Sequence, residues 1–164
     1  MKNNSFAGLM LLFFAFLLVS CSSDDSGGGT LTGTELSISD IQGTWNVTSF
    51  VFVKVCDPGV DCPVVEVDLI EEGATATFVI QNNGAFTITS TVPGSGQEII
   101  TGQMSFDEDL LVIEFDDSPG EDDYFGIQLT NNKNNLSISG PVEYDFDMDG
   151  TDEPAEVNIT LVRA

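Results

Sequence analysis

Apolar and polar side chains alternate through most of the chain after about residue 40. Residues 75–81 place Ala76, Phe78 and Ile80 on one face, with threonines and a glutamine on the other. The alternation resumes at 86–91, after an Asn-Gly pair of the kind that favours tight β-hairpins. Because strand side chains point to opposite faces in turn, both segments predict antiparallel strands.

The same alternation recurs at regular spacing, and Gly, Pro, Asn and Asp mark the turns between segments. Further strands are predicted at 44–55, 98–106, 110–115, 124–130, 136–139, 142–146 and 156–163. The segment 64–72 fits either a strand or a short helical lid. We therefore predict an all-β domain at 39–164, an antiparallel up-and-down eight-stranded barrel, because closure leaves no exposed strand edge. A β-sandwich is the alternative.

The N-terminus has a different pattern, with Lys2 followed by an apolar run from Phe6 to Val19. This run is short for a membrane span and is typical of a secretory signal peptide at 1–20. Its end, Leu-Val-Ser-Cys, resembles the lipobox of bacterial lipoproteins, which implies cleavage before Cys21 and lipid on its sulfur. An ordinary signal peptide with a chance cysteine is the alternative. Residues 21–38 are rich in Ser, Asp and Gly and predict a flexible tether.

The residues that follow Cys21 also resemble sorting signals of Gram-negative lipoproteins. Ser22 resembles the residue that directs such lipoproteins to the outer membrane, and the acidic pair Asp24-Asp25 resembles a signal for export to the cell surface. The resemblance implies a lipid-anchored outer-membrane protein at the cell surface. An exported protein meets an oxidising environment, so Cys56 and Cys62 are expected to form a disulfide. A Cys-X5-Cys metal site is the alternative, but the chain has no histidine to complete a zinc site.

The composition of the chain argues against a nucleic-acid partner and against an enzyme. The formal net charge is −23, with 27 acidic and four basic residues. Phosphate recognition needs clustered lysine and arginine, so no nucleic-acid partner is expected. Without histidine, and with the two cysteines of the domain paired, the commonest catalytic base and nucleophile are missing. We therefore expect a protein that is not an enzyme.

Several segments taken together resemble bacterial lipocalin-like lipoproteins. Gly43-Thr44-Trp45 resembles the Gly-X-Trp entry to the first strand, and the closing strand ends at Arg163 as in that family. The turns in NNGAFTI, GQMSFDEDLLVI and LTNNKNNLSIS are similar in order and spacing. The resemblance implies a barrel plugged at one end by Trp45, with Arg163 packed over its ring, and a mouth for a small hydrophobic ligand.

One acidic segment, DFDMDGTDEPAE at 145–156, has the residue spacing of an EF-hand calcium loop. Gly140-Pro141 before it and the strand-forming residues after it exclude the flanking helices that an EF-hand needs. We predict instead a β-hairpin tip that binds Ca²⁺ through Asp145, Asp147, Asp149, the Thr151 carbonyl and Glu156. A plain solvated acidic turn is the alternative.

These observations leave two functions. The first is a membrane-anchored barrel that binds a small hydrophobic molecule. The second is a surface protein with a filled barrel, whose calcium-stabilised hairpin contacts a protein or glycan partner. Twelve phenylalanines fit either, and seven of them are expected to belong to the core rather than to a pocket: Phe50, Phe52, Phe78, Phe86, Phe106, Phe115 and Phe125. An open apolar cavity would distinguish the first function from the second.

Overall fold

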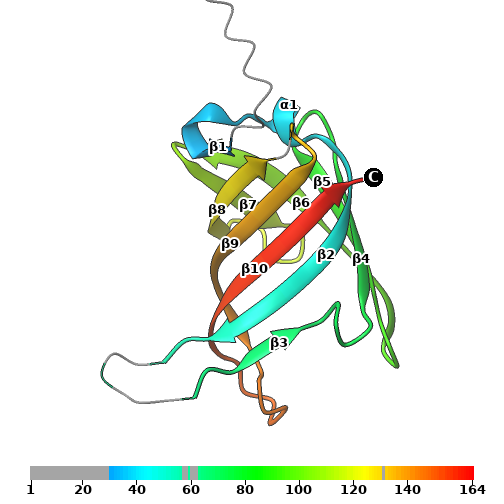
Figure 1. Ribbon diagram of the computed structural model, residues 1–164, viewed down its shortest axis with the longest axis vertical. Coiled ribbons are helices and arrows are strands. Elements are labelled where there is room, and N and C mark those ends of the chain that lie inside the picture. Colours follow the sequence, from blue (N-terminus) through cyan, green and yellow to red (C-terminus); the bar gives the residue numbers. More distant parts are fainter. Residues whose placement is uncertain (1–29, 57–58, 60–62, 131) are drawn as a thin grey trace, which may run out of the picture.

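The strands close into a single antiparallel barrel in the computed structural model, which describes residues 30–56, 59, 63–130 and 132–164. The barrel strands pair in chain order, and the last pairs back with the first (Figure 1). They are β2 (Gly43–Lys54), β4 (Thr75–Ile80), β5 (Ala85–Val92), β6 (Gly96–Asp107), β7 (Leu110–Phe115), β8 (Asp122–Thr130), β9 (Asn135–Tyr144) and β10 (Glu153–Arg163). The prediction of an eight-stranded up-and-down barrel is confirmed.

Short elements at the N-terminal side pack on one end of this barrel. β1 (Leu31–Thr32) pairs with β8, and the 3-10 helix η1 (Gly33–Glu35) and α1 (Ile38–Ile41) follow. The described chain thus joins the sheet at Leu31, within the segment expected to be a tether. Neither helix of the described ranges is long and apolar enough to cross a membrane. The predicted signal peptide at 1–20 and the lipidation site Cys21 lie outside the described residues.

Two of the predicted segments have a different form in the structure. The stretch 64–72 contains the short strand β3 (Glu66–Asp68), which pairs with β2 and is followed by turns. β9 runs unbroken through Gly140 and Pro141 and pairs with β10 along its whole length. Its pairing with β8 ends at Ser139, so Pro141, which lacks an N–H, lies where β9 has only one neighbour.

A β-bulge changes the face that β2 presents to the barrel interior. The register with β10 shifts between Thr160 and Leu161, and Thr48 is the extra residue on β2. Trp45 and Val47 are buried before the shift. After the shift, the even-numbered residues of β2 pair with the buried residues of β10. Phe50 and Phe52 therefore face the barrel interior.

Packing divides the interior into two halves. The half near α1 is filled by side chains with less than 2% exposure: Trp45, Ile41, Met104, Leu111, Leu129, Leu136 and Leu161. None of the buried residues within the described ranges is polar or charged. Apolar burial at this density supplies most of the folding free energy, so this half is the structural core.

Candidate functional site

The filled end of the barrel is closed by a tryptophan and an arginine. Trp45 is fully buried and donates its Nε1–H to the Ile41 carbonyl at 2.7 Å. The Arg163 guanidinium lies 4.1 Å from the centroid of the Trp45 ring. It also donates to the carbonyls of Gln42 (2.8 Å), Asp40 (3.1 Å) and Lys133 (3.0 Å). These contacts join α1, β10, the start of β2 and the turn between β8 and β9 at this end.

A glycine allows the arginine to lie so close to the chain. Gly43 has φ of +131°, and a Cβ atom there would lie 2.7 Å from Nη1 of Arg163. This backbone conformation and this approach both exclude a larger residue. The glycine of the Gly-X-Trp pattern therefore has a local physical role beside the tryptophan.

The opposite half of the barrel holds an apolar cavity of about 290 Å³. Its walls come from all eight barrel strands and from the turn after β3. The lining is almost entirely aliphatic and aromatic, and it includes Phe50, Phe52, Ala76, Phe78, Ile88, Ile100, Ile113, Phe115, Phe125 and Val142. Of the phenylalanines expected in the core, Phe78, Phe86 and Phe125 are buried there. Phe50, Phe52 and Phe115 are instead half-buried residues of the cavity wall. Their sequence pattern could not show this, because a wall and a core have the same alternation.

One side of the cavity is covered by the turn that follows β3. Leu69 and Ile70 line the cavity from this turn. Asp68 fixes the turn, since its carboxylate accepts the Ser49 hydroxyl at 2.9 Å and the N–H groups of Phe50 (3.1 Å) and Ile70 (2.9 Å). Burial raises the pKa of this carboxyl, but the hydrogen bonds outweigh burial and hold the pKa below its ordinary value.

A row of aromatic rings leads from the cavity towards its rim. Phe50 stacks on Phe52 at 5.1 Å between centroids, Phe52 stacks on Tyr144 at 4.1 Å, and Tyr144 meets Phe146 edge-on at 4.9 Å. Lys54 closes the row, with Nζ 5.8 Å from the Phe146 centroid and an ion pair to Glu153. Burial raises the pKa of the Tyr144 phenol, and the charges of Glu72 and Asp145 raise it further.

The barrel wall separates beside this cavity. Residues 122–125 of β8 pair only with β7, and residues 140–144 of β9 pair only with β10. A cleft of about 570 Å³ lies between them, and it shares Phe115, Phe125 and Val142 with the cavity. The strands diverge at Gly140, where a Cβ atom would lie 2.6 Å from Cδ1 of Phe125. The barrel wall is therefore open at its side, and this side opening borders the cavity through the shared residues.

The predicted calcium loop forms the tip of the β9–β10 hairpin, at the open end of the barrel. Carboxylate oxygens of Asp145, Asp147 and Asp149 lie within 4.8 Å of one another, so this group could hold a metal ion. Their carboxylates also accept the N–H groups of Asp149, Gly150 and Thr151. Glu156 lies on β10 opposite Pro141 and is not a member of the group.

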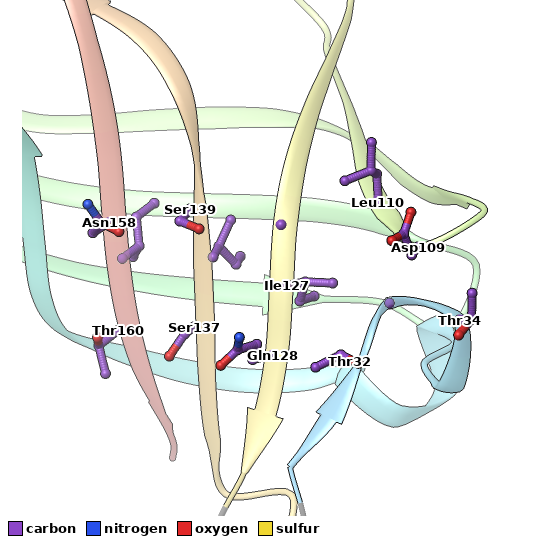
Figure 2. Close-up of a pocket in the computed structure, with 14 residues that line it drawn as sticks. Thr32, Thr34, Asp109, Leu110, Ile127, Gln128, Ser137, Ser139, Asn158 and Thr160 are labelled. Carbon is purple, nitrogen blue, oxygen red and sulfur yellow. The ribbon is translucent and has the colours of Figure 1, made fainter. Parts of the chain in front are cut away.

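A polar groove of about 530 Å³ crosses the outer face of the barrel. Figure 2 shows Asn158 and Thr160 on β10, Ser137 and Ser139 on β9, and Gln128 on β8 lined up across three strands. β1 and η1 border one end of the groove, near Asp109. Its labelled side chains are mostly uncharged hydroxyls and amides, which offer hydrogen bonds without charge.

Sequence reasoning missed two features of this site. The side opening arises from pairings between strands far apart in the chain, and no local pattern encodes it. The carboxylate of Glu98, which lines the cavity, does have a sequence signal, because Glu98 is in phase with the inward-facing residues Ile100, Gly102 and Met104. The predicted Cys56–Cys62 disulfide involves Cys62, which lies outside the described residues.

Comparison with protein-family models, curated proteins and solved structures finds no match. The fold assignment therefore depends on geometry. Eight antiparallel strands in up-and-down order close around an interior that is plugged at one end and hollow at the other. The chain has a lipocalin-like β-barrel fold.

Proposed function

We propose that the protein binds a small apolar molecule inside its barrel. The observation that carries this proposal is the cavity of about 290 Å³ in the half that the core side chains leave open. This volume is close to the lower end of the range for ligand pockets, about 300–1,000 Å³. Its wall is apolar, so transfer of an apolar molecule from water would be favourable by roughly 25 cal/mol per Å² of buried surface.

Filling the cavity tests this function. Ala76→Trp places an indole inside the cavity wall, whereas Val79→Trp adds the same group to the outer face of the same strand. Purified protein would be titrated with the neutral dye N-phenyl-1-naphthylamine, whose fluorescence rises in apolar surroundings. We expect saturable binding by the wild type and by Val79→Trp, and loss of binding in Ala76→Trp. Equal binding by both variants would place the dye outside the barrel and contradict the proposal.

A calcium ion at the hairpin tip would stabilise the open end of the barrel. Three carboxylates at such close range repel one another, and a hard cation with oxygen ligands relieves this repulsion. The Thr151 carbonyl is the further ligand that the sequence suggests, whereas Glu156, the other predicted ligand, lies outside the group. This role is structural and compatible with ligand binding in the cavity.

Thermal unfolding of chelator-treated protein in increasing calcium tests the ion site. At a hundred times its dissociation constant, calcium would add about 2.7 kcal/mol to the free energy of unfolding. Asp147→Ala combined with Asp149→Ala should abolish this rise. The control, Glu121→Ala with Asp122→Ala, removes two charges from another loop at the same end and should retain it. A flat response of the wild type would make the tip an ordinary acidic turn.

An interaction role for the outer surface is the second candidate. The polar groove across β8, β9 and β10 favours it, because rows of hydroxyl and amide groups suit the hydroxyls of a glycan. Binding to a glycan array should then be lost in Asn158→Leu and retained in Ala76→Trp. The opposite result would assign the binding to the cavity.

Lipid anchorage at Cys21 follows from the signal-peptide resemblance and would hold the barrel at the bacterial outer membrane. Metabolic labelling with a radioactive fatty acid tests it. The wild type should incorporate label, and Cys21→Ser should not. Label in the Cys21→Ser variant would exclude this cysteine as the anchor.

A further inference from the structure

The wall of the apolar cavity contains one acidic side chain. Glu98 lines the cavity from β6, in phase with the inward residues Ile100 and Met104. Its cross-strand neighbour on β5 is Ser90, which also lines the cavity. Among the described residues, no hydrogen bond or ion pair engages the Glu98 carboxylate, which is exposed at the rim of the cavity. A carboxylate in this position favours a positively charged partner.

The side opening carries the same sign of charge. Asp123 on β8 and Glu143 on β9 line the cleft on its two edges, together with Phe115, Phe125 and Val142 of the cavity wall. In the described part of the chain, neither of these carboxylates has a cation within ion-pair distance. The side opening therefore carries two uncompensated carboxylates.

The described cations are committed to structural contacts. Arg163 covers Trp45, and Lys133 pairs with Asp40, both at the plugged end. Lys54 lies at the open end, but it pairs with Glu153 and lies over Phe146. An anionic ligand would thus meet negative charge without a free cation to balance it. Because Glu98, Asp123 and Glu143 are exposed, salt would screen this repulsion.

The aromatic row adds a second source of attraction for a cation. Phe52 and Tyr144 stack along the wall from the cavity to the rim, and Lys54 already uses the face of Phe146 in this way. Ring faces carry a negative quadrupole that attracts ammonium groups. Apolar walls, a carboxylate and aromatic faces form the set of groups that an organic ammonium ion with an apolar tail requires.

We propose that the cavity selects cationic amphiphiles, with the apolar part in the barrel and the ammonium group beside Glu98. This selection rests on the proposed function, since it requires that the cavity binds apolar molecules at all. It excludes fatty acids, which have the same tail but the opposite charge. Asp123 and Glu143 raise the local concentration of such cations at the side opening, and Glu98 holds the head group once the tail is inside.

A matched series of ligands tests this selection by isothermal titration calorimetry on the purified protein. Octylamine, 1-octanol and octanoate share one tail and differ in head-group charge at neutral pH. We expect octylamine to bind about tenfold more tightly than octanol, a difference of about 1.4 kcal/mol, and octanoate to bind more weakly than octanol. The preference for octylamine should shrink as salt concentration rises.

Substitutions distinguish the head-group site from general attraction to an acidic surface. Glu98→Gln should reduce the affinity for octylamine to that for octanol and leave octanol unchanged. Glu156→Gln removes the same charge from the outer face of β10 and should leave both affinities unchanged. Ala76→Trp should abolish binding of both ligands, and octylamine that still binds to this variant would be adsorbed outside the cavity, which contradicts the proposal.

The possible failures have different meanings. If none of the three ligands binds, the proposed function and the charge selection both fail. If octanol or octanoate binds at least as tightly as octylamine, the cavity binds apolar molecules and only the cation selection is overturned. An equal loss of octylamine affinity in Glu98→Gln and Glu156→Gln would also overturn the role of Glu98.

Discussion

Replacement of Arg163 tests how the closed end of the barrel is held together. The guanidinium donates to three backbone carbonyls and lies over the Trp45 ring, and no other cationic side chain has this planar, forked geometry. In Arg163→Lys, one ammonium group can keep the charge and about one of the hydrogen bonds. In Arg163→Met, the stem remains but the charge and every hydrogen bond are lost.

The expected losses follow from these contacts. Two hydrogen bonds at about 1 kcal/mol each give a loss of about 2 kcal/mol for Arg163→Lys. Arg163→Met loses the third hydrogen bond and a cation–π contact of about 1 kcal/mol, for a total of about 4 kcal/mol. For a domain of this size, these losses lower Tm by about 7 °C and 14 °C.

Urea unfolding followed by tryptophan fluorescence measures these losses, because Trp45 is the single tryptophan. Lys133→Met is the matched control at the same end. It breaks an ion pair between partly exposed side chains and should cost less than about 1 kcal/mol. Losses below about 0.5 kcal/mol for both Arg163 variants would refute the plug as a stabilising contact. Ligand binding should be unchanged, since the cavity lies in the other half of the barrel.

Three further predictions concern packing and pH. Gly102→Ala should lower the free energy of unfolding by about 1–3 kcal/mol, because the new Cβ would lie 2.2 Å from the Glu114 carbonyl oxygen. Gly126→Ala, whose Cβ would have its nearest contact at 3.5 Å, should be neutral or stabilising in the same chemical unfolding experiment. Folding lowers the pKa of Asp68, so its contribution to stability is present above the ordinary pKa of 3.8 and is lost as pH falls through the lowered pKa. In Asp68→Asn, the free energy of unfolding should therefore fall less steeply as the solution is made acidic. The pKa of Tyr144 is raised above 10.0, so stability should fall as pH rises through the raised value, and Tyr144→Phe should remove that fall in alkaline melting curves.

The strands of the barrel could be predicted because each one has a buried and an exposed face. β7 is predicted at 110–115, where it lies, because a short apolar run stands there between two acidic turns. The sequence predicts β9 in two pieces, 136–139 and 142–146, on either side of Gly140-Pro141. Pairing with β10 overrides this local preference, which is a tertiary effect invisible in the sequence.

The site was harder to predict than the fold. The bulge at Thr48 places Phe50 and Phe52 on the cavity wall, and bulges carry no strong sequence signal. By contrast, the convergence of Asp145, Asp147 and Asp149 was predictable, because all three lie within one short loop. Local groups of residues can be predicted from sequence, whereas a cavity depends on how distant strands separate.

The plugged end also fixes the direction in which the barrel would present its mouth. The described chain begins at Thr30, beside β1 and α1 at the plugged end, and the β9–β10 loop lies at the opposite end (Figure 1). Thr30 comes nine positions after Cys21, which gives a reach of at most about 32 Å. A lipid on Cys21 would therefore hold the plug towards the bilayer and turn the mouth to the surrounding medium. A ligand would then be captured from solution rather than withdrawn from the membrane.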